Sequence, residues 1–382
     1  MNFVAKILNL SRSATLKLEE KNILRRAFIK HKFFQDIIEA YRLDKKFGFY
    51  EEGTVVAKTS DGLRVVRGFP KIRRALTIDP TIKKHFKNKK IAVEEKMNGY
   101  NVRVVKFGEN LYGITRRGLF CPYTTEKIRE KIPADFFDDY PDYMLCVEAV
   151  GEASPYVPTT IYNIADLDFY LFDIRHSKTN EPLSIKEKEE IAASYELKIA
   201  PILAVVNPDE TEIIKRVIED LNSKNREGVV LKDVEMMIEP IKYTTSFANC
   251  LDLNYAFKYF NEYARDFMLA RIVREAFQSF EFKDSDEEFD ERCRRLGASI
   301  LGSLVESIDS VNKGEIVAEK CRLIFSNPEI IELFKEHLKL QRINFRLKII
   351  EKKGDQTIVL LERIMRGTTD KISSILNGAL WR

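Results

Sequence analysis

The spacing of hydrophobic and polar positions changes along the chain. Between residues 14 and 45 the apolar residues recur at helical intervals, as in Leu16, Ile23 and Phe28, which predicts helix. Residues 54–67 instead alternate apolar and polar side chains around the dipeptide Asp61-Gly62, which predicts a β-hairpin. The first part of the chain is therefore expected to form a helix followed by a hairpin.

From residue 91 to residue 243, short apolar runs that are typical of strands are mixed with amphipathic helices. Helices are predicted at 185–197 and 210–221, because Ser184 and the run Asn207-Pro208-Asp209 provide start signals before them. This mixture predicts an α+β fold built on antiparallel sheet.

Beyond residue 246 the pattern becomes helical. Residues 250–312 predict amphipathic helices rich in aromatic side chains, Gly314 marks a break, and further helices are predicted at 315–325, at 329–339 and toward the end. The predicted regions are a helix and hairpin module at 1–66, a catalytic domain at 67–246, and helical domains at 247–314 and 315–382.

Composition adds limits to this picture. The net charge is only +4, because 63 basic residues nearly cancel 59 acidic ones, so any affinity for nucleic acid must come from local patches. The five cysteines are scattered singly, which argues against a disulfide framework and a structural zinc site. No apolar run approaches the roughly 18 residues of a membrane span, so we expect a cytoplasmic protein without membrane contact.

The strongest chemical signal lies around Lys96. Residues 91–103 predict an apolar strand, a turn at Asn98-Gly99 and a second strand, a hairpin that would hold Lys96 at the lip of a sheet. An ordinary lysine has a pKa of about 10.4 and is a poor nucleophile at neutral pH. Beside other cations, and partly removed from water, it would lose its proton more easily and could attack phosphorus.

Further segments follow in a fixed order, each next to a predicted strand. They are Thr115-Arg116-Arg117-Gly118, Leu145-Cys146-Val147-Glu148, Asp168 to Ile174, Glu227-Gly228-Val229-Val230 and Ile241-Lys242-Tyr243. With Lys96-Met97-Asn98-Gly99 they resemble motifs I, Ia, III, IIIa, IV and V of the nucleotidyltransferases that form a lysyl-nucleotide. Arg67-Gly68-Phe69-Pro70-Lys71 and the helical tail make the whole chain similar to the archaeal homodimeric ATP-dependent RNA ligases.

That resemblance implies an antiparallel-sheet adenylation core with a small N-terminal α/β module and helical C-terminal domains. It also implies a role for each matching residue. Lys96 is the nucleophile, and Lys242 is the cation at the α-phosphate, which would also lower the pKa of Lys96. Glu148 and Glu227 would hold Mg²⁺ or Mn²⁺. The residues expected to bind ATP are Glu94, Glu95, Met97, Asn98, Asn101, Arg103, Arg116, Glu148, Phe172, Glu227, Lys232 and Lys242.

Two of these assignments rest on finer arguments. Glu94 is preferred over Glu95 for the adenine amino group, because residues two apart in a strand share a face and Glu94 shares one with Lys96. Phe172 is expected to stack on the base. Motif V departs from many relatives, because Pro240 stands where they carry a lysine, and Lys232 is a candidate for the missing charge.

The activity implied by the resemblance has three steps. Lys96 takes up AMP from ATP, AMP passes to the 5′-phosphate of single-stranded RNA, and a 3′-hydroxyl expels it, within one strand to make a circle or between two. Single-stranded DNA as a substrate stays open, and the aromatic helix at 255–267 is expected to form a homodimer interface. An ATP-dependent DNA ligase or a capping guanylyltransferase is disfavoured, because both usually carry a small β-barrel after motif V. A non-catalytic RNA-binding protein is the remaining alternative.

Overall fold

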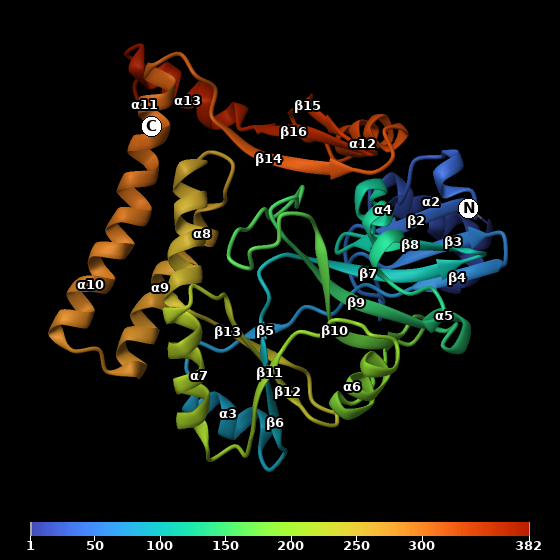
Figure 1. Cartoon of the computed structure of the whole chain (residues 1–382), viewed down its shortest axis with the longest axis horizontal. Helices are drawn as coiled ribbons and strands as arrows, with labels where there is room; N and C mark the ends of the chain where they lie inside the picture. Colours follow the sequence, from blue (N-terminus) through green and yellow to red (C-terminus); the bar gives the residue numbers. More distant parts are fainter. Residues whose placement is uncertain (1, 382) are drawn as a thin grey trace.

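The N-terminal part of the chain forms a small α/β module, visible at the right of the computed structural model, which describes residues 2–381 (Figure 1). Helices α1 and α2 pack against an antiparallel sheet of order β1-β2-β3-β4. The hairpin predicted at 54–67 is confirmed as β3 and β4. The elements are α1 (Asn2–Leu8), α2 (Arg12–Glu20), β1 (Leu24–Arg26), a 3₁₀ turn (Lys32–Phe34), β2 (Ile37–Leu43), β3 (Val55–Thr59) and β4 (Gly62–Val66).

The helix predicted across residues 14–45 is wrong beyond α2. Leu24 of β1 instead pairs with Leu43 of β2. On β2, Ile37 is buried while Ile38 is 46% exposed, which is the two-residue period of a strand. Pairing with the β3–β4 hairpin buries Leu24, Ile37 and Leu43. Contacts distant in sequence therefore override the local helical spacing.

The core contains two sheets that meet near its centre. One has the order β11-β6-β12-β13-β5 and the other the order β10-β9-β7-β8. All pairs are antiparallel except β5 with β13, so the predicted α+β class is confirmed. The strands are β5 (Arg73–Arg74), β6 (Ile91–Glu95), β7 (Tyr100–Phe107), β8 (Asn110–Thr115), β9 (Tyr143–Val150), β10 (Asp168–His176), β11 (Ile202–Val206), β12 (Gly228–Asp233) and β13 (Ile241–Thr244).

Five helices cover these sheets. The two that the sequence predicts at 185–197 and 210–221 are confirmed as α6 and α7. Ser184 begins α6 with a reciprocal capping box to Glu187, as its position in the sequence indicates. The helices are α3 (Asp79–Phe86), α4 (Pro122–Lys131), α5 (Phe136–Asp139), α6 (Ile185–Ser194) and α7 (Thr211–Ser223).

Strands β6 and β7 do not form the predicted hairpin. β6 pairs with β11 and β12, whereas β7 pairs with β8 and β9. The chain therefore crosses from one sheet to the other at residues 96–99. Gly99 is required there, because a Cβ atom would lie 2.2 Å from the carbonyl oxygen of Ala149. This close approach brings the two sheets together beside Lys96.

The predicted helices after residue 246 are confirmed and stand together at the left of the molecule (Figure 1). Thr245 caps α8 by accepting from the backbone of Ala248. Within residues 2–381, no helix is both long and apolar enough to cross a bilayer. The helices are α8 (Ser246–Lys258), α9 (Arg265–Phe282), α10 (Asp286–Gly297), a π-helical turn (Ala298–Gly302) and α11 (Ser303–Asn312).

The last segment corrects the prediction of an all-helical C-terminal domain. The predicted helix at 329–339 is confirmed as α12, but residues 315–325 lie largely in a strand of a three-stranded sheet of order β14-β16-β15. Its apolar residues, Phe325 among them, join the catalytic core, and the rings of Tyr123 and Phe325 lie 4.9 Å apart. The elements are β14 (Ala318–Phe325), α12 (Glu329–Leu340), β15 (Phe345–Lys353), β16 (Gln356–Ile364) and α13 (Arg366–Leu376).

Candidate active site

A cavity of about 310 Å³ opens where the two core sheets meet, at the end of β6 and the start of β7. Small-molecule sites have volumes of roughly 300–1,000 Å³, so this cavity can hold a nucleotide-sized ligand. Most of the predicted site residues line it together with Lys96: Glu94, Glu95, Met97, Asn101, Arg116, Glu148, Phe172, Lys232 and Lys242.

Lys96 stands at the point where the two sheets join. Its backbone N–H donates to the carbonyl oxygen of Gly228 at 2.8 Å, and its Nζ lies 2.6 Å from Oε1 of Glu227. Burial favours a lower pKa for Lys96, but the charges of Glu227 and Glu148 outweigh it and raise the pKa. The prediction that cations depress this pKa is therefore wrong for this arrangement of charges. Lys96 is held here as an ammonium group.

Glu148 and Glu227 form the acidic side of the site. Glu148 lies on β9 opposite Asn101 on β7, and burial raises its pKa to about 7 against the opposing charge of Lys96. These two carboxylates share the site with the ammonium group of Lys96, and a divalent cation would further favour their ionised forms. Mg²⁺ often takes only one or two protein carboxylates and completes its shell with phosphates and water. The pair thus fits the predicted metal, although residues 2–381 contain no group of three or more potential ligands.

A row of side chains crosses the five-stranded sheet beside Lys96. The strand register pairs Glu94 with Val230, Val230 with Lys242, and Lys242 with Arg74. Paired residues on neighbouring strands share a face, so Arg74 lies next to Lys242. Burial, and then the charges of Arg74 and Lys96, lower the pKa of Lys242 to about 8. Arg74 is a cation that the sequence analysis missed.

Beneath the cavity, Glu94 is enclosed by two lysines. Nζ of Lys188 and Nζ of Lys232 each lie 2.6 Å from one of its carboxylate oxygens. Lys232 also lies 2.9 Å from Asp173 and donates to the carbonyl oxygen of Phe172 at 2.7 Å. An ammonium group has three donors, and these three acceptors use them all. Lys232 is therefore committed to the interior, which argues against its predicted use as the missing phosphate-binding cation.

An aromatic wall faces the polar side of the cavity. Phe172 lies at an irregularity of β10, between Leu171 and Asp173, and meets Phe69 edge-on with ring centroids 5.1 Å apart. Both rings line the cavity, as a stacking platform for a base requires. Across the cavity, Oδ1 of Asn101 is buried and has no hydrogen-bond partner in the described structure, which leaves an acceptor for a ligand donor.

Three residues predicted to bind ATP are not among those that line this cavity. Glu227 pairs with Lys96 at its edge, and Arg103 and Asn98 are placed elsewhere. Arg103 is fully buried, and its guanidinium donates to backbone carbonyls that include those of Gly53 at 3.0 Å and Thr115 at 2.9 Å. It fixes the N-terminal module to the core and does not line the cavity. The backbone of Asn98 donates to the hydroxyl of Tyr162 at 2.7 Å, and its side chain lines a neighbouring cavity. Neither placement gives contact with a ligand beside Lys96.

The structure also adds residues that the sequence analysis did not assign. Phe69, Tyr100 and Ala200 line the cavity, and Lys188 holds Glu94 from below. Phe69 belongs to the segment 67–71 that already indicated the site, so it could have been proposed. Lys188 and Arg74 had no local signal, because their positions depend on packing and strand register between distant parts of the chain.

Comparison with known sequences gives a consistent result. Residues 89–244 match the family model described as RNA ligase, and residues 255–379 match the model described as ligase Pab1020 C-terminal region. An uncharacterized protein of Methanocaldococcus jannaschii is 41% identical over 390 residues, which span 100% of this chain and 97% of that protein.

Solved structures resemble the chain over its whole length. Two forms of an archaeal ATP-dependent RNA ligase are 34% and 33% identical, each with a TM-score of 0.90, over 100% of this chain and 99% of theirs. A putative ATP-dependent DNA ligase from Aquifex aeolicus is 24% identical with a TM-score of 0.88, over 97% of this chain and 100% of that one. At that identity the match shows the fold alone.

Proposed function

Because the chain belongs to the archaeal ATP-dependent RNA ligase family and is an enzyme of that class, we propose that it works through an AMP group carried covalently on Lys96. In this reaction Lys96 first takes AMP from ATP. The AMP then passes to the 5′-phosphate of single-stranded RNA, and a 3′-hydroxyl attacks that activated end and releases AMP. Within one strand the product is a circle.

The observation that carries this proposal is the pairing of Lys96 with Glu227 at the edge of the cavity. Attack forms a bond from Nζ to the α-phosphorus and breaks the bond to the departing pyrophosphate, so Nζ must first lose a proton. Oε1 of Glu227, at 2.6 Å, stabilises the proton on Nζ while the two groups pair, so the proton would leave to water once Glu227 binds the metal instead. While Glu227 and Glu148 face Lys96 they raise its pKa. Once the two carboxylates bind a metal ion instead, burial and the charge of Arg74 favour a lower pKa of Lys96.

Glu148 and Glu227 are proposed to hold Mg²⁺ or Mn²⁺. This assignment is supported by the raised pKa of Glu148, because a carboxylate that resists ionisation gains from a nearby cation. When bound, the metal would offset the negative charge that gathers on the phosphates. The two carboxylates would orient it, and the phosphates and water would complete its shell.

Lys242 and Arg74 are proposed to stabilise the phosphates. Lys242 lines the cavity and would meet the α-phosphate. Arg74 stands beside it in the strand register and outside the cavity lining, where the departing pyrophosphate would pass. In this role Arg74, and not Lys232, supplies the positive charge that motif V lacks because Pro240 stands in place of a lysine.

The adenine is proposed to stack on Phe172, with Glu94 at its edge. Glu94 and Phe172 are supported in these roles by their place in the cavity and by the lysines that fix them. Lys188 and Lys232 both donate to the carbonyl oxygen of Phe172, and both pair with Glu94. One buried pair of lysines would therefore position the carboxylate and the aromatic ring together.

We also propose that the enzyme is a homodimer, with its interface on the part of α9 that follows the aromatic segment 255–267 expected from the sequence, because Tyr255, Tyr263 and Phe267 line a cavity instead. On α9, Leu269, Val273, Phe277 and Phe280 are exposed at helical spacing, with Phe280 at 81%. A contiguous apolar stripe of this kind marks an interaction surface. In the same helical region, Phe289 on α10 and Val305 on α11 are also exposed. Sedimentation of the wild type and of Phe277→Glu tests this assignment, since a dimer held by the stripe would become a monomer.

The direct test of the reaction supplies 5′-phosphorylated single-stranded RNA with ATP and Mg²⁺. We expect both adenylated and circular RNA. Parallel reactions with GTP, and with nicked duplex DNA, separate this activity from those of a capping enzyme and a DNA ligase. Labelling by GTP in preference to ATP, or joining of nicked DNA alone, would contradict the proposal.

A further inference from the structure

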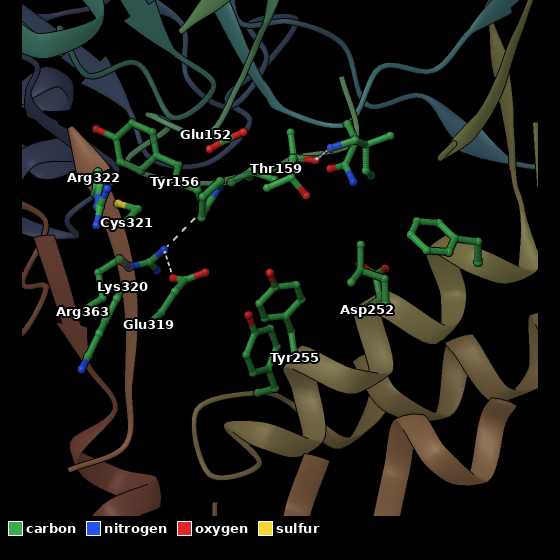
Figure 2. Close-up of a pocket in the computed structure, with 18 of the residues that line it drawn as sticks. Glu152, Tyr156, Thr159, Asp252, Tyr255, Glu319, Lys320, Cys321, Arg322 and Arg363 are labelled. Carbon is green, nitrogen blue, oxygen red and sulfur yellow. Dashed lines mark hydrogen bonds and ion pairs between the residues drawn. The ribbon is translucent and has the colours of Figure 1, made fainter. Parts of the chain in front are cut away.

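A second and larger cavity, of about 700 Å³, lies next to the one beside Lys96. Figure 2 shows it between strand β14 at the left, helices α8 and α9 below, and the loop that carries Glu152 and Thr159 above. The catalytic core, the helical region and the C-terminal sheet thus each contribute a wall. None of the residues assigned to ATP above lies in these walls except Asn98, whose placement excluded it from that role.

Asn98 connects the two cavities. Met97 lines the cavity beside Lys96, whereas the next residue, Asn98, lines the larger one. The hydrogen bond from the Asn98 backbone to the Tyr162 hydroxyl, at 2.7 Å, fixes this divide. A chain that occupied the larger cavity would therefore reach the reacting centre within a few bonds of Lys96.

One wall of the larger cavity is aromatic. Tyr255 comes from α8, Phe267 comes from α9, and Tyr263 lies in the turn between them, with the rings of Tyr263 and Phe267 5.2 Å apart. All three side chains are only partly buried, so their rings are not consumed by the core. Figure 2 shows Tyr255 projecting into the space between the helices and the loop above. Exposed rings inside a cavity are the surfaces on which unpaired bases stack.

The opposite wall is formed by β14 and β16. Glu319 and Cys321 lie two apart on β14 and so share a face of the strand, and Glu319 pairs with Arg363 of β16 at 2.8 Å. Arg363 also donates to the carbonyl oxygen of Tyr156 in the loop above. This wall therefore presents a neutralised ion pair to the aromatic rings, while the alternate residues Lys320 and Arg322 belong to the other face of the strand.

From this arrangement we infer that the larger cavity binds an unpaired ribonucleotide of the RNA substrate, next to the end that reacts. Its base stacks on Tyr255 and the neighbouring rings. The inference rests on the proposed function, and it explains why the C-terminal sheet packs against the core. An unpaired nucleotide fits better than a duplex, because three walls enclose the space and paired bases would hide the faces that stack.

The test uses the full-length enzyme and compares Tyr255→Leu with Tyr255→Phe. Tyr255→Leu removes the ring but keeps an apolar side chain, whereas Tyr255→Phe keeps the stacking surface. We expect the RNA-dependent rates of Tyr255→Leu, divided by its rate of self-adenylation, to fall about tenfold, which is the scale of one lost base stack. Tyr255→Phe should restore most of that loss.

Two arms identify which strand occupies the cavity. Slower AMP transfer to a 5′-phosphorylated RNA assigns it to the donor strand, whereas slower joining of pre-adenylated RNA alone assigns it to the acceptor strand. Wild-type values of Tyr255→Leu in both arms would overturn the inference, as expected if the cavity holds a peptide. A wild-type protein that fails to label itself with ATP would instead overturn the proposed function, so the two failures are distinct.

Discussion

Two lysine–glutamate pairs in the core have the same contact distance but different surroundings. Lys96 lies 2.6 Å from Glu227, and Lys232 lies 2.6 Å from Glu94. Lys96 is 21% exposed at the cavity and has Glu227 as its one ion-pair partner in residues 2–381, whereas Lys232 is 2% exposed and is also held by Asp173. A saturated ammonium can only support structure. The reactive lysine therefore differs from the structural one in two ways: it has fewer ion-pair partners, and its side chain is accessible to a ligand in the cavity.

The largest expected effect breaks the reactive pair. Lys96→Met should lower self-adenylation by at least about a thousandfold, because no other side chain supplies the attacking amine. The free energy of unfolding should change by about 1 kcal/mol or less, since the pair is partly open to solvent. Labelling with radioactive ATP and urea unfolding measure the two quantities. If Lys96→Met still labels itself with ATP, the nucleophile must be another residue.

The matched change, Lys232→Met, should affect stability first. Removal of one partner from a buried ion pair leaves the charges of Glu94 and Asp173 poorly compensated, at a cost of about 3–5 kcal/mol. Urea unfolding under the conditions used for Lys96→Met gives the comparison. Weaker binding of ATP is also expected, because Lys232 holds Glu94 and Phe172. Wild-type stability of Lys232→Met would contradict its structural role and with it the contrast between the two pairs.

Substitution of Arg74 tests whether a second cation supports the reaction at Lys96. Arg74→Gln should slow self-adenylation about tenfold to a hundredfold, which corresponds to the roughly 1.5–3 kcal/mol of a hydrogen bond to a charged group. Its neighbour Arg73 pairs only with the exposed Glu239 at 3.2 Å, so Arg73→Gln is the control and should keep the wild-type rate. Equal rates for both variants would contradict the proposal that Arg74 replaces the motif V lysine that is absent at Pro240.

The same variant predicts a shift in pH dependence. The pKa of Lys242 is about 8, and the charge of Arg74 is one cause of that low value. The positive charge of Lys242 is therefore lost as pH rises through about 8. In Arg74→Gln the pKa of Lys242 should rise, and the alkaline fall in self-adenylation should move to higher pH. Lys242→Gln should have no such fall, and a fall at the same pH in that variant would assign it to another group.

His337 tests the structural side with the smallest effect. Burial lowers its pKa to about 3, and its imidazole is 2.8 Å from the Tyr156 hydroxyl, where the C-terminal sheet region meets the core. Its folded pKa lies below its unfolded value, so the stability it provides is complete above about pH 6.5 and is lost as pH falls toward 3. Between pH 7 and pH 5 the wild type should lose about 2 kcal/mol more than His337→Gln. Parallel curves for the two proteins would contradict this.

The sequence indicated the local elements of the site and missed its long-range geometry. The strand before Lys96, the strand around Glu148 and the helix after Ser184 follow patterns within a few residues, so they could be predicted. The sheet that each strand joins depends on distant partners, which is why the hairpin at Asn98-Gly99 was wrong. For the same reason Arg74 was missed, since only the pairing of β5 with β13 brings it to Lys242.

The C-terminal sheet could have been found from the sequence. Residues 345–353 and 356–364 are rich in β-branched and long apolar side chains, and Gly354-Asp355 lies between them as a turn signal. Gly354 indeed has a φ of 56°. The helical spacing of α12 is clear in the sequence. The flanking residues 315–325 and 345–364, which do not have this spacing, lie largely in strands instead. What no local pattern could give is the cavity between this sheet and α8, because its walls come from three regions of the chain.

The central claim is that Lys96 becomes bonded to AMP. The direct measurement treats the purified protein with ATP and Mg²⁺, digests it, and locates the added AMP by mass spectrometry. We predict one AMP on the peptide that contains Lys96 and none on the peptides that contain Lys188, Lys232 or Lys242. AMP on one of those lysines, or no covalent AMP at all, would contradict the account.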